Sequence, residues 1–291
     1  MSLPRLGYIG LGLMGGPMSR HLVSKGYAVR GFDIRAEVLE AAAQQGVHPC
    51  NSIREACAGA DVVLLNLPTT DAMREVVLGR GGLLEVLKPP QLVVDFSTIE
   101  LDAAQGFIQG LADVGCAWID APVSGGPVAA GQGSLTVMAG GHAEAVARVQ
   151  ILMSHISARF TVVGPPGSGL VAKMLNQLIV GCLHAVMAEA VLVAEHAGID
   201  ATLIPQALAG GHADGVLFQQ IVPRMLERDF APRGYARQLL KDLDMVLAYA
   251  GRLKLPTPMT SQAQTLYRLL VHLGHAELDT SAVLKVYDSR G

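Results

Sequence analysis

Short runs of apolar residues alternate with amphipathic segments along the first 165 residues of the chain. Two of these runs, 61–67 (DVVLLNL) and 92–95 (LVVD), are almost continuously apolar, which is typical of parallel strands buried on both faces. Strands that alternate with helices indicate βαβ units and a doubly wound sheet. The pattern predicts strands at 5–10, 28–33, 61–67, 92–95, 117–120, 135–139 and 160–163, and helices at 14–25 and 35–45.

The pattern changes at the turn sequence GPPGSG, residues 164–169. Proline and glycine clusters mark loops, so we expect two domains, 1–165 and 166–291. Residues 170–196 then form one long helical pattern rich in Ala, Leu and Val, and no later segment is typical of a strand. The further helices are predicted at 202–209, 215–227, 235–253 and 261–272. The second domain is therefore expected to be all-α and to begin with a long interdomain helix.

Composition is consistent with a folded two-domain protein. The chain has 291 residues, and about 150 residues are typical of one domain. Hydrophobic residues make up 51% and charged residues 16%, so a large core is available and wholesale disorder is excluded. The formal net charge of −3 argues against a nucleic-acid binder that relies on bulk positive charge.

The cysteines and histidines suggest neither disulfides nor a metal site. Cys50, Cys57, Cys116 and Cys182 form no CxxC pair, and the nine histidines show no ligand spacing such as HExxH. We expect free thiols in a reducing compartment and no bound metal. The chain shows no signal peptide and no run of about 20 apolar residues, so we expect a cytoplasmic protein without a membrane span.

A glycine motif follows the first predicted strand and opens the first predicted helix. This GxGxxG sequence consists of Gly10, Leu11, Gly12, Leu13, Met14 and Gly15. In such a context the glycines allow a tight turn and a close approach of a pyrophosphate, while the helix N-terminus attracts its charge. The alternative is an ordinary turn between strand and helix. The strand that precedes the motif favours a Rossmann dinucleotide-binding domain.

Asp33 ends the second predicted strand, about 20 residues after the glycine motif, where Rossmann folds recognise the adenosine ribose. A carboxylate there accepts hydrogen bonds from both ribose hydroxyls and repels a 2′-phosphate. The position favours NAD over NADP. Arg35 lies two residues further on and can partly reverse this preference, so NADP stays open.

Four ordered segments resemble the β-hydroxyacid dehydrogenase family, which includes 3-hydroxyisobutyrate dehydrogenases and tartronate semialdehyde reductases. They are YIGLGLMGGPM at 8–18, DAPVSGG at 120–126, GSGLVAKMLNQ at 167–177 and GYARQLLKDL at 234–243. The resemblance spans nearly the whole chain. It implies hydride transfer between a nicotinamide cofactor and a small 3-hydroxy acid or its semialdehyde. It also implies that the helical domain helps to build a homodimer or homotetramer.

Lys173 is the expected general acid and base. It lies near the start of an apolar helix, and partial burial lowers the pKa of a lysine toward neutrality. The alternative is a lysine that reaches solvent from the helix face. Asn176 and Gln177 follow on the same helix face, and the family commonly carries Asn where Gln177 stands. Which amide contacts substrate stays open, although the shorter Asn176 is favoured.

The turn Ser124, Gly125 and Gly126 matches the family's substrate-binding motif, and its successive backbone N–H groups suit a carboxylate. The alternative is a loop that only redirects the chain. By resemblance, Leu67, Pro68 and Thr98 line the nicotinamide side of the cofactor site, and Lys241 approaches the cofactor. The alternative for Lys241 is an ion pair with Asp242 or Asp244.

Three other functions remain as alternatives. An imine reductase has the same architecture but usually replaces the lysine that stands here at 173. A 6-phosphogluconate-type enzyme needs a longer chain and a His-Asn pair after the lysine. A non-catalytic cofactor-binding scaffold loses the lysine and gains a further module. Lys173 favours the hydroxyacid dehydrogenase over the imine reductase and the scaffold, and the chain length and the pair Asn176-Gln177 favour it over the 6-phosphogluconate-type enzyme.

Overall fold

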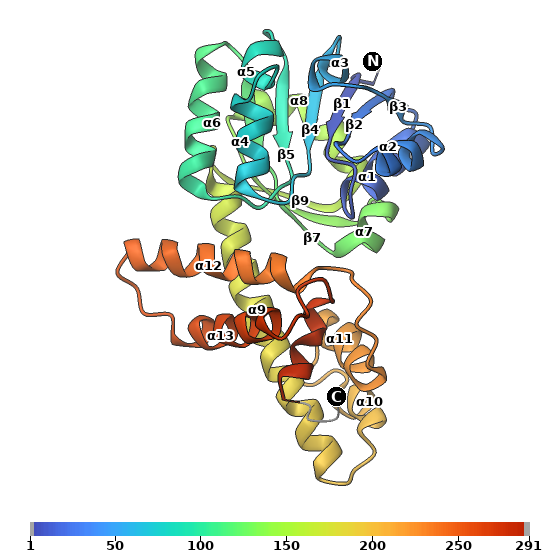
Figure 1. The fold of residues 1–291 in the computed structure, drawn as a ribbon, viewed down its shortest axis with the longest axis vertical. Coiled ribbons are helices and arrows are strands. Elements are labelled where there is room, and N and C mark those ends of the chain that lie inside the picture. Colours follow the sequence, from blue (N-terminus) through green and yellow to red (C-terminus); the bar gives the residue numbers. More distant parts are fainter. Residues whose placement is uncertain (1–2, 288–291) are drawn as a thin grey trace. The chain divides into compact units, whose positions relative to one another are not determined.

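The computed structural model describes residues 3–287 and divides the chain into two compact units, Met1–Lys173 and Met174–Gly291 (Figure 1). The helix α9 (Ser168–His196) begins in the first unit and continues through the second. The expected class, a doubly wound α/β domain followed by a long helix and a helical domain, is confirmed.

The first unit contains a nine-stranded sheet whose first six strands are parallel and run in the order β3-β2-β1-β4-β5-β6, the Rossmann order. β8 pairs antiparallel with β6 and β7, and β9 pairs parallel with β8. The strands are β1 (Leu6–Ile9), β2 (Val29–Phe32), β3 (His48–Pro49), β4 (Val62–Leu65), β5 (Leu92–Asp95), β6 (Ala117–Asp120), β7 (Val123–Ser124), β8 (Leu135–Gly140) and β9 (Ser157–Gly164).

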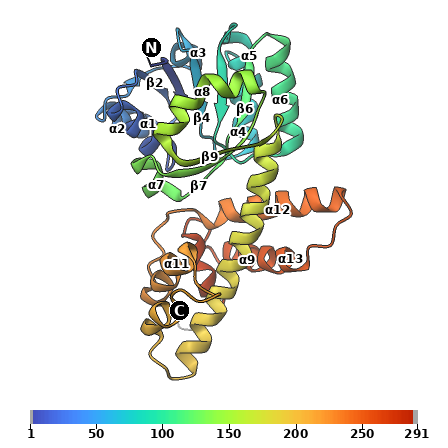
Figure 2. The same cartoon turned by 180° about the vertical axis from the view of Figure 1, so that it is seen from behind.

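Helices cover both faces of this sheet (Figures 1 and 2). Successive residues of a strand point to opposite faces, so Leu64 packs in one core and Val63 and Leu65 in the other. One face is covered by α1 (Gly15–Ser24), α2 (Ala36–Ala43) and α8 (Ala143–Ile156), and the other by α3 (Ile53–Cys57), α4 (Thr70–Leu78), α5 (Leu83–Val86) and α6 (Leu101–Asp113). This double cover explains why the strand sequences are almost continuously apolar.

The strand order reverses between β1 and β4, which are neighbours in the sheet although two further strands separate them in the chain. Ligands of open α/β sheets bind at such a reversal, outside the carboxyl ends of the strands. The glycine motif follows β1 and Leu67 follows β4 at this edge. The sheet therefore brings the two predicted cofactor segments to the same place.

Within its described residues, the second unit is built from helices. Its one extended pairing is an isolated bridge between Tyr235 and Asp279. Its core is formed by the inner faces of the longer helices and of η2. Besides α9, the elements are η1 (Ala201–Leu203), α10 (Ile204–Leu208), α11 (Val216–Glu227), α12 (Ala236–Arg252), α13 (Pro258–His272) and η2 (Thr280–Val286).

The helices α4, α6 and α8 were not assigned individually from the sequence, and the other differences concern short elements. The predicted helix 202–209 is a 3₁₀ turn followed by α10, because Pro205 occupies the first turn of a new helix. The two-residue strands β3 and β7 and the five-residue helix α3 are too short to show a period. The small helix α7 (Gly126–Gln132) follows a turn with Pro127 in its first turn.

The helix α9 is long and apolar enough to cross a membrane by length and composition. The core helix of a soluble protein meets the same criteria, so this is weak evidence for a span. The absence of a membrane span stays a prediction.

The second unit contains a buried ion pair between Arg224 of α11 and Asp279, with 2.9 Å between Nη1 and Oδ1. The guanidinium also donates to Ala231 O at 2.7 Å, and Asp279 accepts the Arg233 N–H at 2.8 Å. Burial would raise the pKa of Asp279, but the hydrogen bonds and the arginine hold it below its usual value. This pair ties the segment before α12 to the segment before η2.

We expect Asp279→Ala to destabilise the second unit by about 3–5 kcal/mol, because the buried Arg224 charge loses its fully buried carboxylate partner and keeps only the more exposed Asp229. The measurement is urea unfolding followed by far-UV circular dichroism. The matched control is Glu277→Ala, which removes an exposed pair with Arg237 and is expected to change stability by less than about 1 kcal/mol. Equal effects of the two substitutions would contradict the role given to burial.

Candidate functional site

The glycine motif forms the loop between β1 and α1. Gly10 has φ of 87°, in the left-handed region that favours glycine, and a Cβ on it would collide with the carbonyl oxygen of Asn66. A Cβ on Gly15 would collide with the carbonyl oxygen of Gly10. Met14 occupies the N-cap position of α1 and provides no side-chain hydrogen bond to it. The loop is thus a tight backbone cradle at a helix N-terminus, the arrangement that binds a pyrophosphate.

Asp33, directly after β2, reaches back to this loop. Its Oδ2 accepts the N–H of Leu11 at 2.9 Å, and its Oδ1 accepts the backbone N–H of Arg35 at 3.0 Å. The Arg35 side chain forms an ion pair with the same carboxylate at 3.1 Å. Burial would raise the pKa of Asp33, but the bonds from Arg35 and Leu11 hold it below its usual value. Asp33 is therefore an ionised carboxylate beside the cradle.

Arg35 is about half exposed, whereas its partner Asp33 is almost fully buried. Its Nη2 lies 2.9 Å from the position that a Cβ on Gly12 would occupy. The guanidinium therefore lies over the glycine loop while it pairs with Asp33. One positive group thus lies against both the glycine loop and the carboxylate that follows β2.

A second polar network fixes the turn after β4. The N–H of Leu67 donates to Ser97 Oγ at 2.8 Å, and the N–H of Ser97 donates to Asp95 Oδ1 at 2.8 Å. Asp95 ends β5 and is fully buried. Thr98 follows these residues and is partly exposed, as Leu67 is. The network aligns the Leu67–Pro68 turn with the end of β5.

The first turn of α9 is attached to the sheet through Asp120, the last residue of β6. Its Oδ1 accepts the N–H of Gly167 at 2.6 Å, and its Oδ2 accepts the N–H of Leu170 at 2.9 Å. A carboxylate suits this place because the N–H groups at a helix N-terminus lack partners within the helix. Burial raises the pKa of Asp120 to about 6, although the backbone donors act in the opposite direction.

Lys173 lies one turn further along α9 and is buried, with 8% of its surface exposed. Its Nζ donates to the carbonyl oxygen of Val123 at 2.8 Å. Val123 directly precedes the Ser124–Gly126 turn, in which Gly125 and Gly126 have φ of 125° and 70°. Only glycine adopts both angles readily. The structure thus brings the predicted amine beside the predicted anion-binding turn, and the lysine does not reach out to solvent.

The remaining predicted residues belong to the second unit and form a hydrogen-bonded chain. Asn176 Nδ2 donates to Gln177 Oε1 at 2.8 Å, and Gln177 Nε2 donates to Asp242 Oδ2 at 2.6 Å. Lys241 Nζ forms an ion pair with the other oxygen of Asp242 at 3.1 Å. Gln177 is therefore held at both ends of its amide, and Lys241 has the carboxylate partner that the alternative interpretation named.

Sequence reasoning missed the groups that position these residues. Asp120, Ser97 and Asp95 are polar, buried and placed at or just after strand ends. A buried polar residue at the carboxyl end of a parallel strand was a usable signal, since that edge of the sheet is where a ligand binds.

His184 is buried and bonded to Val180 O and Thr280 Oγ1, and burial lowers its pKa, which fits a packing role.

Two family models match adjoining parts of the chain. Residues 5–164 match the NAD binding domain of 6-phosphogluconate dehydrogenase. Residues 167–287 match the NAD-binding domain of NADP-dependent 3-hydroxyisobutyrate dehydrogenase. Together the two matches cover nearly all described residues.

Characterised relatives match over their full length. An NAD-dependent L-serine dehydrogenase of Pseudomonas aeruginosa is 34% identical, with 98% of each chain covered. A 2-hydroxy-3-oxopropionate reductase of Escherichia coli is 31% identical, with 98% of this chain and 97% of the relative covered. A crystal structure of 3-hydroxyisobutyrate dehydrogenase from Salmonella typhimurium has a TM-score of 0.89 and 28% identity, and covers 98% of this chain and all of that one.

We expect the wild type to lose stability relative to Asp120→Asn as the pH rises from 4 to 7. The carboxyl titrates near pH 6 when folded and near its ordinary value of 3.8 when unfolded. Between these values the folded protein keeps a proton that the unfolded chain has released. The stabilising contribution of Asp120 is therefore complete below pH 4 and falls by about 3 kcal/mol as the pH passes 6.

The single tryptophan, Trp118 on β6, reports this change through its fluorescence during urea unfolding at each pH. Asp113→Asn, at an exposed position of the same unit, is the control and should give a difference that does not vary with pH. A pH-independent difference for Asp120→Asn as well would mean that burial does not dominate at this carboxyl.

Proposed function

The chain belongs to the β-hydroxyacid dehydrogenase family, and from this premise we propose that it transfers a hydride between a nicotinamide dinucleotide and a small 3-hydroxy acid or its semialdehyde. L-serine, 3-hydroxyisobutyrate and 2-hydroxy-3-oxopropionate, the compounds in the relatives' names, all carry a carboxylate and an oxygen on the third carbon. The substrate class is therefore defined by a carboxylate and a hydroxyl or aldehyde two carbons away.

The observation that supports this proposal most directly is the bond between Lys173 Nζ and Val123 O, at 2.8 Å. It holds a buried amine beside Ser124, Gly125 and Gly126. An anion in that turn would have its carboxylate held by backbone N–H groups and the Ser124 hydroxyl. Its oxygen on the third carbon would then be the group within reach of the amine.

In the oxidation direction, Lys173 accepts the proton of the substrate hydroxyl, and in the reduction direction it returns a proton to the aldehyde oxygen. Asn176 hydrogen-bonds that oxygen and orients it. We assign this contact to Asn176 because the Gln177 amide is already bonded to Asn176 on one side and Asp242 on the other. The bond that Asn176 Nδ2 donates to Gln177 Oε1 fixes the orientation of the Asn176 amide. A dinucleotide held at the Gly10–Gly15 loop would supply the hydride acceptor or donor.

The residues of the first unit fit a dinucleotide. The backbone cradle at Gly10–Gly15 suits its pyrophosphate, and the Asp33 carboxylate suits the ribose hydroxyls. By the family resemblance, Leu67, Pro68 and Thr98 would contact its nicotinamide end, and Lys241 would contribute a positive charge. We propose NAD as the preferred cofactor because Asp33 is ionised and would repel a 2′-phosphate.

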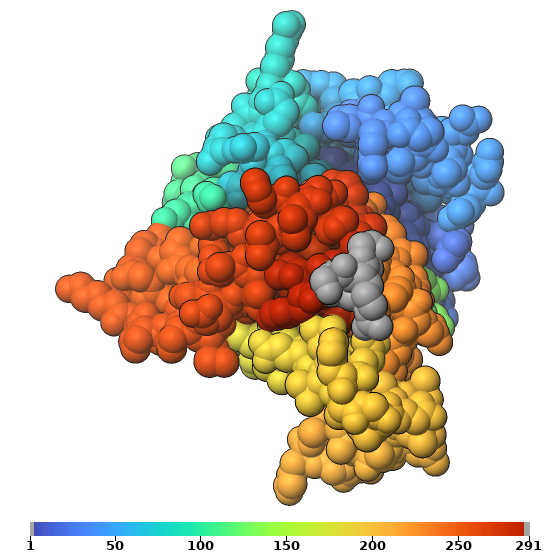
Figure 3. Space-filling model, turned by 60° about the horizontal axis from the view of Figure 1, so that its bottom comes forward, coloured from blue at the N-terminus to red at the C-terminus, as the bar shows by residue number. Residues whose placement is uncertain are grey.

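We also propose that the protein is a cytoplasmic homodimer or homotetramer. α9 carries a stripe of exposed apolar side chains at helical spacing, which a second copy of the chain would cover. Figure 3 shows the last part of α9 and the segment after it, in yellow, at the surface of the second unit. The exposed residues of the stripe are Leu175, Ile179, Leu183, Val186 and Val193.

We expect Lys173→Ala to lower kcat by at least about 10²-fold, because the proton then has no positioned acceptor. The measurement is NADH formation with a panel of short 3-hydroxy acids that includes L-serine and 3-hydroxyisobutyrate. Lys88→Ala, at an exposed position of the first unit, is the control and should keep wild-type turnover. Near-normal turnover of Lys173→Ala would remove the lysine from the mechanism.

We expect Asp33→Ala to weaken NADH binding by about 10- to 100-fold and NADPH binding much less. NADH loses hydrogen bonds to a charged acceptor, whereas the loss of repulsion and the release of Arg35 favour NADPH. The measurement is the dissociation constant of each reduced dinucleotide from its fluorescence. Equal losses for the two cofactors would contradict the assignment of Asp33 to the ribose.

A further inference from the structure

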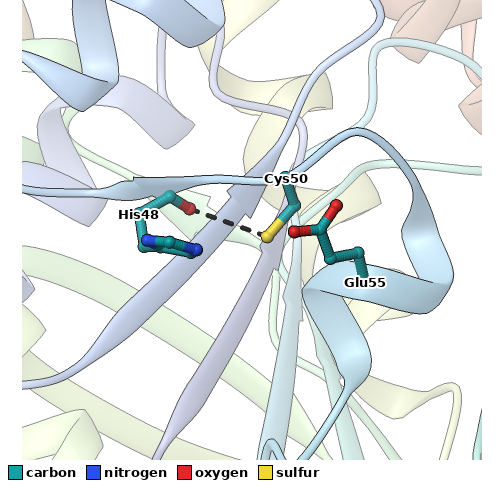
Figure 4. Close-up of side chains that lie close together, drawn as sticks. All are labelled: His48, Cys50 and Glu55. Carbon is teal, nitrogen blue, oxygen red and sulfur yellow. Dashed lines mark hydrogen bonds between the residues drawn. The ribbon is translucent and has the colours of Figure 1, made fainter.

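Three side chains of different donor type gather at the β3 edge of the sheet in the first unit. They are the imidazole of His48, the thiol of Cys50 and the carboxylate of Glu55 (Figure 4). Their ligand atoms all lie within 4.8 Å of one another, and Figure 4 shows the Cys50 sulfur between the other two groups. His48 is exposed, Glu55 is half-buried and Cys50 is fully buried. The cluster is thus open to solvent at the imidazole and closed at the sulfur.

Nitrogen, sulfur and carboxylate oxygen together are the donors that zinc prefers, at about 2.0–2.3 Å from the metal. Tetrahedral ligands at such bond lengths lie roughly 3.3–3.8 Å apart. The ligand atoms are therefore at most about 1–1.5 Å further apart than in a tetrahedral zinc site. The His48 side chain is exposed, so rotation about its side-chain bonds can bring its ring nitrogen closer to the other two ligand atoms.

The backbone fixes the spacing of the three residues. His48 is paired with Arg30 of β2 in the parallel register, and the Cys50 N–H donates to Gly31 O at 2.8 Å. Glu55 lies in the first turn of α3, where its Oε2 accepts the N–H of Asn51 at 2.9 Å. One carboxylate oxygen of Glu55 is therefore used to bind the backbone just before α3. The other oxygen, Oε1, is 3.5 Å from the Arg30 guanidinium, a loose contact that a metal can replace.

The local charge is compatible with a divalent cation. A thiolate and a carboxylate together neutralise a 2+ ion, and metal binding expels the thiol proton. The Arg30 side chain lies against the cluster, where its Nε donates to the backbone carbonyl oxygen of Glu55 at 3.1 Å and its Nη2 lies 3.5 Å from Glu55 Oε1. A bound cation would therefore take the place of the guanidinium at that carboxylate oxygen.

We propose that His48, Cys50 and Glu55 bind one Zn²⁺ ion, with water as the fourth ligand. The ion joins the short edge strand β3 to α3 and so stabilises this edge of the sheet. The site is made by residues of the first unit that take no part in the proposed hydride transfer, and it does not depend on that function. Neither the spacing of cysteines nor that of histidines in the sequence indicated it, because the three ligands are of three kinds.

The test is a titration of the chelator-treated full chain with Co²⁺, which gives a sulfur-to-metal charge-transfer band when a thiolate binds. We expect one equivalent of Co²⁺ to produce the band and Zn²⁺ to abolish it. Cys50→Ser should remove the band, and His48→Gln and Glu55→Gln should each weaken binding by at least about tenfold. Cys116→Ser and His142→Gln, a buried thiol and an exposed imidazole elsewhere in the unit, are the matched controls and should bind as wild type does.

A thermal readout keeps the proposal testable if Cys50→Ser does not fold. Zn²⁺ should raise the Tm of the wild type and of both controls, and raise it much less in the exposed variant His48→Gln. Absence of the band in the wild type, its persistence in folded Cys50→Ser, or equal Zn²⁺ stabilisation of wild type and His48→Gln would each overturn the site. A band that is lost in Cys57→Ser but kept in Cys50→Ser would place the ion on another thiol and also overturn it.

Discussion

The arrangement of the first unit depends on one buried carboxylate. Asp120 ends β6 and accepts backbone N–H groups from the start of α9, so the sheet and the first turn of the helix are joined by two hydrogen bonds. Lys173 follows in the next turn, and its amine donates to the carbonyl oxygen of Val123, three residues beyond Asp120. A short loop of β6–β7 chain is thereby bonded to α9 at both ends, which leaves the amine little freedom to move.

The same principle recurs along the carboxyl edge of the sheet. Asp33 follows β2 and bonds to the glycine loop, and Asp95 ends β5 and bonds to Ser97, which holds Leu67. In each case an acidic residue at a strand end orients backbone belonging to another segment. The loops that contact ligands in open α/β folds are otherwise the least constrained parts of the molecule. Here hydrogen bonds to residues at the strand ends fix the conformation of these loops.

The central strands and α9 could be predicted from sequence because strands buried on both faces give continuous apolar runs and a long helix gives many turns of one pattern. β5 and β6 lie at the predicted residues, and α9 begins at Ser168 and ends, as predicted, at His196. β3 and α3 escaped prediction because two or five residues contain less than one period of any pattern. At the site, the glycine motif and Lys173 have recognisable contexts. The contact of Lys173 with Val123 O and the bond between Gln177 and Asp242 do not, because both join residues about 50 or more positions apart.

The pairing of Arg35 with Asp33 has a consequence for how cofactor preference is set. The carboxylate that would receive a ribose already has a cationic neighbour, which also overlies the glycine loop. A dinucleotide that binds here would therefore replace existing bonds of Asp33 or Arg35 with bonds to its ribose or its phosphate. The preference for NAD or NADP is the difference between their two binding free energies. Because the two free energies involve the same pair of charges, a small change at that pair can reverse the preference. In this architecture, two positions on a single turn can therefore redirect an enzyme from one redox pool to the other while the rest of the fold stays as it is.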